Sequence, residues 1–265
     1  MIRMSLKILG TRGEIEETSE KHKKHSGILI EDVLFDLGEP IYLDLHPKAI
    51  FLSHLHPDHY FPEKDKKEEN PLREHSKIPI YSIEKPRGAE NWIKLKKGKE
   101  YKVGNLTVIP IPTVHSKKVK TTGFLIKTKG KRILYTSDLL WIKKKWHDKI
   151  KNLDLVITDG SSFDKDLIRR DKETGQPYGH ASVKKLVKFF KDKGAKNIII
   201  THYGKWLVED PKKGYIKIKE LTDEKTKVIP AKDGDEFSLE ELITTKEIKP
   251  LVPKVIAKVE PKWGL

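Results

Sequence analysis

The sequence predicts an α/β fold, and three observations support that fold class. Short runs of apolar and β-branched residues recur along most of the chain, which is the signal of β-strands. Several of these runs are almost continuously apolar, so much of the predicted sheet should be covered on both faces. One segment has its apolar residues at helical spacing instead, and it predicts an amphipathic helix.

Nine strands are predicted in chain order. Each runs for four to seven residues and is rich in Val, Ile, Leu, Phe or Thr, the residue types that suit a pleated, buried surface. The predicted strands are residues 6–9, 27–30, 33–36, 49–53, 106–112, 122–127, 132–138, 154–159 and 197–202.

The predicted helix begins after Ser182, a residue type that caps helix N-termini, and ends near Gly194. Its apolar residues fall at i, i+3, i+4 and i+7, which places them on one face. They are Val183, Leu186, Val187 and Phe190.

Two segments between these elements are polar and rich in turn residues. We expect loops or lids over residues 65–77 and 164–180. From about residue 241 the chain contains three prolines and little periodicity. The sequence therefore predicts one domain over residues 1–240 and a C-terminal extension, 241–265, that packs on the domain or trails from it.

The composition excludes several kinds of site. The 265 residues include no cysteine, which rules out disulfides, zinc–thiolate sites, iron–sulfur clusters and cysteine nucleophiles. Any metal must therefore be bound by His, Asp or Glu. Charged residues make up 35% of the chain, mostly Lys and Glu, a composition typical of proteins adapted to high temperature.

The net charge of +15 points to an anionic partner. Residues 84–120 hold ten Lys and Arg against three Glu, and residues 141–151 hold five Lys against one Asp. Basic segments near a site favour an anionic substrate, with nucleic acid as one such substrate. The alternative is a lysine-rich surface that is simply solvated, and the sequence does not decide between the two.

No apolar run has the length of a membrane span, and no secretory segment follows Met1. We therefore expect a cytoplasmic protein that does not bind membranes. The sequence does not determine the oligomeric state, and a homo-oligomer is one possibility.

The segment "SHLHPDH" (53–59) concentrates four potential metal ligands directly after a predicted strand. His54 and His56 are two residues apart, so in extended backbone they can point the same way. Asp58 and His59 follow Pro57, where the chain must turn. The segment can thus present two pairs of ligands to two neighbouring points, whereas a solvated histidine-rich loop is the alternative.

Three further ligand types stand at the ends of later predicted strands. His115 follows residues 106–112, Asp138 ends 132–138, and His202 ends 197–202. Loops gather at the edge of a sheet where its strands end, so these side chains can meet the histidine-rich segment there.

This set of residues resembles the metallo-β-lactamase-fold hydrolases. The resemblance extends over roughly residues 1–240 and includes "LGTRG" near the start, "FDLGE" at 35–39 and "AKDGDEFSL" at 231–239. It implies a four-layer αββα sandwich with two divalent metal ions at one edge of the sheets. By this resemblance His54, His56 and His115 bind the first metal, Asp58, His59 and His202 bind the second, and Asp138 bridges them. Zinc fits nitrogen and oxygen ligands best, with manganese and iron as alternatives.

Other residues indicate the branch of the superfamily. The antibiotic-destroying lactamases have Cys where Asp138 stands, and the flavodiiron oxidoreductases have Glu where His56 stands. The segment "GHAS" (179–182), which leads into the predicted helix, is instead similar to one in ribonuclease Z and related phosphodiesterases. That resemblance implies that His180 lies beside the reacting phosphate. It also implies that Asp159 supports the site and that Asp36 braces a ligating histidine. The long tRNA-binding arm of ribonuclease Z has no counterpart between His115 and Asp138.

The implied activity is hydrolysis of a phosphodiester, by a nuclease or a small phosphodiesterase, through attack of a hydroxide held between the two metals. Asp58 would also orient the attacking water, and His180 would donate a proton to the leaving group. Two alternatives remain. The same site could hydrolyse a thioester or a lactone, which would not need His180, or the metals could be structural in a nucleic-acid-binding module.

Overall fold

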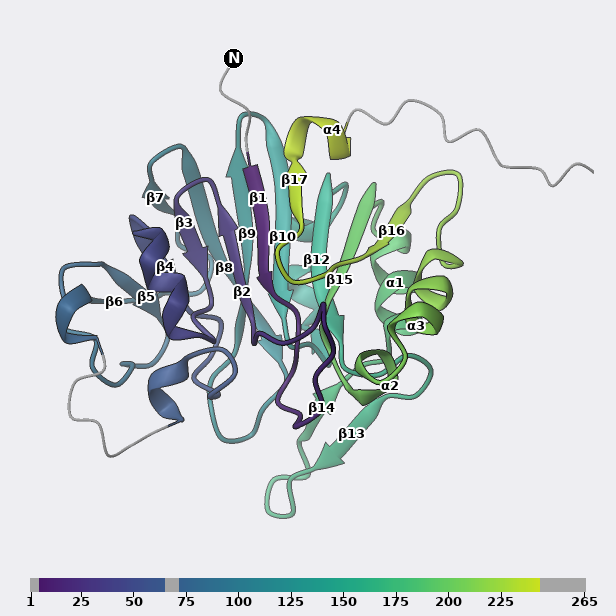
Figure 1. The fold of residues 1–265 in the computed structure, drawn as a ribbon, viewed down its shortest axis with the longest axis horizontal. Helices are drawn as coiled ribbons and strands as arrows, with labels where there is room; N and C mark the ends of the chain where they lie inside the picture. Colours follow the sequence, from purple (N-terminus) through teal and green to yellow (C-terminus); the bar gives the residue numbers. More distant parts are fainter. Residues whose placement is uncertain (1–4, 65–71, 244–265) are drawn as a thin grey trace, which may run out of the picture.

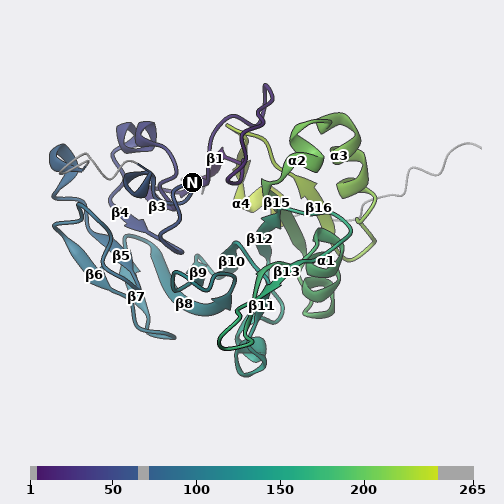
Figure 2. The same cartoon turned by 90° about the horizontal axis from the view of Figure 1, so that it is seen from below.

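A computed structural model describes residues 5–64 and 72–243 of the chain. Two β-sheets lie face to face, and short helices cover their outer faces (Figures 1 and 2). The predicted α/β fold and its four-layer sandwich are confirmed.

The first sheet contains seven strands. One of its edge strands, β17, comes from near the end of the described part of the chain. β17 pairs with β1 antiparallel, with Leu6 opposite Phe237, and so closes this edge. The strands in spatial order are β17 (Glu236–Ser238), β1 (Ser5–Gly10), β2 (Gly27–Ile30), β3 (Val33–Phe35), β4 (Ala49–Phe51), β5 (Ile80–Ser82) and β6 (Trp92–Lys94).

The second sheet contains eight strands. Its spatial order is β11 (Trp141–Ile142), β8 (Leu106–Val114), β9 (Thr122–Thr128), β10 (Lys131–Ser137), β12 (Leu155–Gly160), β15 (Asn197–Tyr203) and β16 (Lys227–Pro230), with β7 (Tyr101–Val103) paired to β8. Together the two sheets contain all nine predicted strands.

Three apolar layers hold the sandwich together. The central layer fills the space between the sheets and includes Phe35, Phe124 and Ile157. A second layer lies between the second sheet and the helices, and a third covers the outer face of the first sheet. Because strands of both sheets are buried on two faces, their sequences read as continuous apolar runs rather than as alternating ones.

The helices of the second sheet's outer face are α1 (Val183–Asp192), α2 (Lys205–Val208) and α3 (Pro211–Lys219), and Figure 2 shows them together on one flank. The predicted helix is α1, and its four predicted apolar residues are buried. Ser182 occupies the cap position, but its side chain makes no capping hydrogen bond. Its backbone N–H instead donates to Asp166 Oδ1 at 2.8 Å.

The outer layer of the first sheet consists of short 3₁₀ helices: η1 (Pro40–Leu45), η2 (Phe61–Glu63) and η3 (Arg73–His75). Proline begins η1 and stands within η2, where a missing N–H does not matter. A further 3₁₀ helix, η4 (Lys144–Ile150), packs Ile150 against the second sheet, and α4 (Leu239–Ile243) buries Leu239 and Leu242 between the sheets.

The prediction of a loop over residues 164–180 is wrong in one respect. It contains a β-hairpin, with β13 (Leu167–Arg170) and β14 (Pro177–His180) paired antiparallel. β13 (LIRR) is exposed and β14 (PYGH) is half-buried, so neither has the run of buried apolar residues that marks a strand. Of the other predicted loop, residues 65–71 lie outside the described residues. So do residues 244–265 of the predicted C-terminal extension, and the boundary at residue 240 stays a prediction.

No helix within residues 5–64 and 72–243 is long and apolar enough to cross a membrane.

Candidate metal centre

The candidate metal centre lies at one edge of the sandwich, where strands of both sheets end. In the second sheet β8, β10, β12 and β15 all run in the same direction, so their carboxyl ends share one edge. In the first sheet β3 and β4 are parallel. The residues that follow these strands meet there, as expected for a site built at strand ends.

Three histidines form the first group of possible ligands. His54 Nε2 lies 3.0 Å from His56 Nδ1, which lies 3.4 Å from His115 Nε2. The far nitrogen of His115, Nδ1, donates to the Gly179 carbonyl at 3.0 Å. This hydrogen bond sets the tautomer of His115 and leaves its Nε2 lone pair facing the other two rings.

Asp58, His59 and His202 form the second group. His202 Nε2 is 3.0 Å from Asp58 Oδ2, and His59 Nε2 is 3.4 Å from the same oxygen. All three residues are at least 95% buried. The group thus offers one carboxylate and two imidazole nitrogens away from bulk water.

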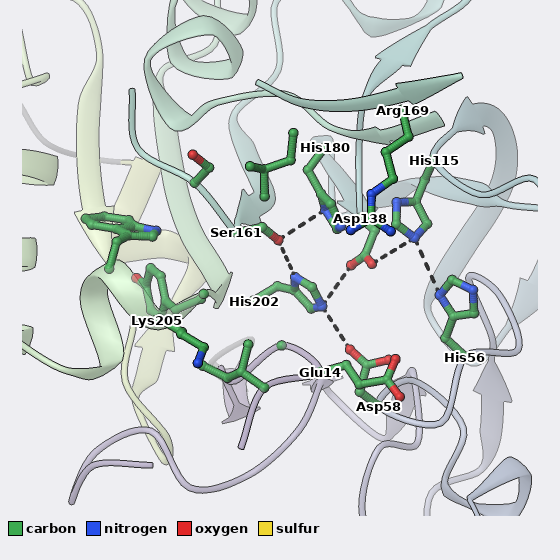
Figure 3. A pocket seen from close by; sticks show the side chains of 17 residues that line it. Glu14, His56, Asp58, His115, Asp138, Ser161, Arg169, His180, His202 and Lys205 are labelled. Atoms are coloured by element: carbon green, nitrogen blue, oxygen red, sulfur yellow. Dashed lines mark hydrogen bonds and ion pairs between the residues drawn. The ribbon is translucent and has the colours of Figure 1, made fainter. Parts of the chain in front are cut away.

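Asp138 lies between the two groups and faces both (Figure 3). Its Oδ1 is 3.1 Å from Nε2 of both His59 and His202. Its Oδ2 is 3.2 Å from His115 Nε2 and 3.7 Å from His54 Nε2. The structure therefore brings all seven predicted ligands together, with one Asp138 oxygen directed to each group.

Asp36 holds His59 of the second group in place through a hydrogen bond. Its Oδ2 accepts a hydrogen bond from His59 Nδ1 at 2.9 Å and another from the Tyr135 hydroxyl at 2.6 Å, while Oδ1 accepts from the Ser53 N–H at 2.7 Å. The carboxylate is fully buried and orients His59 with Nε2 toward Asp138. Hydrogen bonds of this kind hold a metal ligand in place.

The histidines of the first group are held neutral. Burial lowers the pKa of His54 well below its usual value, and the neighbouring His59 adds to this effect. Burial and the nearby His115 likewise lower the pKa of His56 to about 4. Neutral imidazoles carry the free lone pair that a metal cation requires.

Asp58 and the shared Asp138 are held ionised. Burial raises the pKa of Asp58 and Asp138, but the positive charges of His59 and His202 outweigh it and keep both pKa values well below the usual range. In turn, burial lowers the pKa of His202, but Asp138 and the other carboxylates raise it to about 10. Buried carboxylates that hold protons on their histidines provide a setting in which a divalent cation can replace those protons.

Orphaned polar atoms give an independent test of whether a metal fits. Asp58 Oδ1, His59 Nε2 and Asp138 Oδ1 are buried and have no hydrogen-bond partner among the described residues. His59 Nε2 and Asp138 Oδ1 lie close together, but without hydrogen-bonding geometry. Buried polar atoms are nearly always paired, and a cation between the groups would satisfy all three. In each group the ligand atoms lie within 4.8 Å of one another.

His180 lies beside both groups, but it forms a hydrogen bond with Asp159 and not with Asp138 or Asp58. Its Nδ1 is 2.6 Å from Asp159 Oδ2, and its ring centroid is 4.5 Å from that of His115. Burial lowers the pKa of His180, but the Asp159 carboxylate outweighs this and raises it. Asp159 also accepts hydrogen bonds from the N–H and hydroxyl of Ser161. Nε2 of His180 has no partner among the described residues, and His180 could join Asp138 and His202 around a metal.

A cavity of about 570 Å³ opens onto the centre. Its lining includes residues that the sequence reasoning did not find. Ser161 follows Asp159 at a strand end and could have been found by the same logic, whereas nothing in the local sequence marks the others. The missed residues are Glu14, Ser161, Arg169, Lys205 and Trp206.

The two basic segments contribute little to this edge. Of the Lys and Arg residues in 84–120, Lys117 and Lys118 line an adjoining cavity. None of residues 141–151 lines that cavity or the main one within the described part of the chain. Most of the excess positive charge in these segments therefore lies away from the candidate centre.

Comparisons with known proteins agree with this geometry. A family model described as the beta-lactamase superfamily domain matches residues 39–203. One similar structure is the metallo-beta-lactamase fold protein YhfI from Bacillus subtilis, with 19% identity, a TM-score of 0.63, and coverage of 89% of this chain and 99% of that one. Another is a diphosphatase from the PhnP family, with 15% identity, a TM-score of 0.61 and coverage of 89% and 97%.

The short form of human tRNase Z is also similar, at 18% identity and a TM-score of 0.57, with coverage of 89% of this chain and 99% of that one. At these identities the structural likeness shows the fold alone. A search of curated proteins found no significant sequence match.

Proposed function

This chain belongs to the beta-lactamase superfamily of metal-dependent hydrolases, and from that premise we propose that it cleaves phosphodiester bonds with two divalent metal ions. The substrate is an anionic phosphodiester, with nucleic acid as one candidate. One observation carries the proposal: two ligand groups share Asp138 through opposite oxygens, and the His180–Asp159 pair stands beside them.

Seven side chains would hold the metals. His54, His56 and His115 would hold the first, Asp58, His59 and His202 would hold the second, and Asp138, which faces both groups, would contribute to each. This set contains only imidazole nitrogens and carboxylate oxygens, which favours zinc and leaves manganese or iron as alternatives.

Bound divalent cations would supply a nucleophile at neutral pH and would offset charge on the phosphate oxygens. The protein's own residues position the reactants. Asp58 has one oxygen near His202 and one without a partner, so the free oxygen can also orient a water. His180 lines the cavity, and Asp159 fixes its Nδ1 and raises its pKa. A protonated His180 can therefore donate from Nε2 to the leaving oxygen.

The alternative substrates are a thioester or a lactone, whose leaving groups need no His180. A nucleic-acid-binding module with structural metals is a weaker alternative, because structural zinc sites are closed and the cavity here is open.

A side-by-side assay tests the proposal. Metal content is measured on purified protein after supplementation with zinc or manganese. The same preparation is then offered bis(p-nitrophenyl) phosphate, a dinucleotide, a thioester and a lactone. We expect about two metal equivalents, as in a dinuclear site, and fastest turnover of a phosphodiester. Faster turnover of the thioester or lactone would overturn the phosphodiester assignment, and absence of bound metal would overturn the whole mechanism.

A further inference from the structure

A second cavity, of about 440 Å³, adjoins the metal centre on the side of the β13–β14 hairpin. Its lining includes His56, His115 and His180 from the candidate centre, and also Lys117, Lys118 and Tyr178. Arg169 lines both this cavity and the main one. A substrate whose reacting group lies at the metals can thus continue into the second cavity without a break.

The hairpin is fixed to the metal centre through its backbone. The Gly179 N–H donates to the His115 carbonyl at 2.6 Å, and the Gly179 carbonyl accepts from the His115 ring. Strand β14 is therefore joined to a predicted metal ligand by two hydrogen bonds. The position of β13 follows from its pairing with β14, in which Arg169 is opposite Tyr178.

Alternation along β13 decides which side chains face the centre. Leu167 and Arg169 line the cavities, whereas Ile168 and Arg170 line neither. Figure 3 shows Arg169 extending from the hairpin toward His180 and Asp138. Arg170, one residue later, makes a hydrogen bond with the Gly175 carbonyl at the hairpin turn.

Three Lys and Arg side chains of the described chain line the second cavity, and they differ in whether an ion pair already neutralises their charge. Lys117 forms an ion pair with Asp171 at 3.2 Å. The side chains of Arg169 and Lys118 make no hydrogen bond or ion pair with any residue of the described chain. Among the described residues of this lining, Glu14 is the one that carries a carboxylate, and Figure 3 places it beside Asp58. The lining thus contains two cations, Arg169 and Lys118, that no described residue neutralises through an ion pair.

We propose that Arg169, together with Lys118, binds a second phosphate of the substrate, next to the phosphodiester that is cleaved. This inference rests on the proposed function and narrows it to substrates with two neighbouring phosphates. Arginine presents a planar set of donors that matches phosphate oxygens, and an unpaired lysine adds a point charge. The second phosphate is either a terminal phosphate of a short nucleotide or the next internal phosphate of a longer strand.

Matched dinucleotides test the proposal. The substrates are ApA, which has one phosphodiester, its forms with an added 5′- or 3′-terminal phosphate, and ApApA, which has a second internal phosphate. For wild type, kcat/KM should be higher for at least one substrate with a second phosphate, mainly through a lower KM. In Arg169→Ala this advantage should shrink by a factor of about ten to a hundred, the range that a hydrogen bond to a charged group contributes.

Arg170→Ala is the matched control, because it removes the same charge from the same strand but from the other face of the hairpin. It should retain the full advantage of the second phosphate. Arg169→Lys, which keeps the charge but loses the planar donor set, should retain part of it. Thermal unfolding of the variants is compared with wild type, so that a damaged hairpin is recognised.

The outcomes separate this inference from the proposed function. If wild type cleaves ApA but gains nothing from any second phosphate, or if Arg169→Ala keeps the gain, the second phosphate site is wrong and phosphodiester cleavage stands. If metal-loaded wild type cleaves neither ApA nor bis(p-nitrophenyl) phosphate, both proposals fail. The terminal and internal phosphates are distinguished by which substrate shows the gain.

Discussion

At the scale of single residues, His180 differs from the seven predicted ligands in what holds it. Each ligand group converges on Asp138 or Asp58, whereas His180 is held by Asp159 through Nδ1 at 2.6 Å. Its position one residue after Gly179 and two before the helix cap follows from the sequence. Its pairing with Asp159 does not, because that contact joins the ends of β12 and β14.

His180→Ala should keep both metals but lower phosphodiester turnover. General acid catalysis contributes about 10²–10⁴-fold, so we expect a loss in that range for ApA. The loss should be smaller for bis(p-nitrophenyl) phosphate, whose leaving group needs little protonation. Metal analysis and steady-state kinetics measure both effects. His46→Ala, at an exposed position on another loop, is the control.

Wild-type turnover of ApA by His180→Ala with its metals retained would exclude this role. Loss of one metal equivalent would instead show that His180 is a ligand, as its position beside Asp138 and His202 allows.

His22 is a buried histidine outside the metal centre. Its Nδ1 lies 2.6 Å from the Thr11 hydroxyl, and its Nε2 lies 2.6 Å from the Tyr215 hydroxyl. Burial lowers the pKa of His22 to about 4, from 6.5 in an unperturbed side chain. Between these values the unfolded chain binds a proton that the folded chain does not. The part of the free energy of unfolding that depends on a neutral His22 should therefore be fully present above pH 6.5, and it should decrease as the pH falls toward 4.

The contribution of His22 to this fall is at most about 3 kcal/mol. His22→Gln has no titrating ring and can still meet the Tyr215 hydroxyl, so its stability should depend less on pH in this range. Urea unfolding of EDTA-treated protein at pH 7.5 and pH 5 measures the difference. Equal losses in wild type and His22→Gln would show that His22 does not contribute.

At the scale of elements, the sequence predicts strands well where they are buried on both faces. All nine predicted strands are present, and most of them, such as β2, β3 and β4, are buried along their whole length, whereas β1 alternates between buried and half-buried residues. The hairpin β13–β14 could not be predicted in this way, because β13 is exposed along its whole length and has no buried apolar run. Its position depends on contacts with His115 that are distant in sequence.

Backbone conformation at the strand ends is the other feature that the sequence does not reveal. Asp36, Ser137 and His202 all have positive φ, between 55° and 61°. The pairing registers of β10 and β15 also shift near Ser137 and His202. Such conformations cost of order 1–3 kcal/mol and persist where the surrounding structure demands them. Here they turn side chains from the strand ends toward the metal centre.

Gly179→Ala should disrupt the hairpin and disturb His115. Gly179 has a φ of +122°, and an added Cβ would lie 1.9 Å from the Leu167 carbonyl oxygen. Gly179 also holds the His115 ring, and loss of such a partner typically lowers metal affinity or activity by about 10–100-fold. Metal titration and kinetics should show a loss of that size.

Gly175→Ala is the matched control for this prediction. Gly175 also has a positive φ, of +67°, but an added Cβ meets nothing within 4 Å. It should leave metal affinity and kcat/KM unchanged. An equal effect of both substitutions would mean that hairpin strain, and not the contact with His115, accounts for the loss.

At the scale of the whole molecule, the predicted ligand set and the confirmed family come from the same short motif and three strand ends. The seven residues could be predicted because potential ligands stand directly after buried strands, where side chains can meet at one edge of the sheets, and because the set resembles that of a known hydrolase family. Arg169 and Glu14 could not, since each belongs to a segment whose position depends on the complete fold. The basic segments at 84–120 and 141–151 show that charge along the sequence does not locate charge around a site.

The candidate metal centre draws its residues from both sheets, and this predicts a coupling between metal binding and stability. His54, His56, Asp58 and His59 follow a strand of the first sheet, whereas His115, Asp138 and His202 belong to strand ends of the second. An unfolded chain does not hold these residues together, so metal should bind the folded form far better. At a free metal concentration of 100 times Kd this linkage stabilises by about 2.7 kcal/mol. For a domain of this size that raises the Tm by roughly 5–10 °C.

Thermal unfolding in EDTA and in zinc therefore gives the sharpest test at this scale. Wild type should show the higher Tm in zinc, and the change should reverse when EDTA is added. Asp138→Ala removes the one side chain that faces both groups, so its Tm should respond little to zinc. Asp192→Ala, at an exposed end of α1 where the carboxylate forms an ion pair with Lys188, should respond as wild type does. If Asp138→Ala keeps the full increase, Asp138 does not connect the two groups through metal. If wild type shows no increase, the two sheets do not share a metal centre.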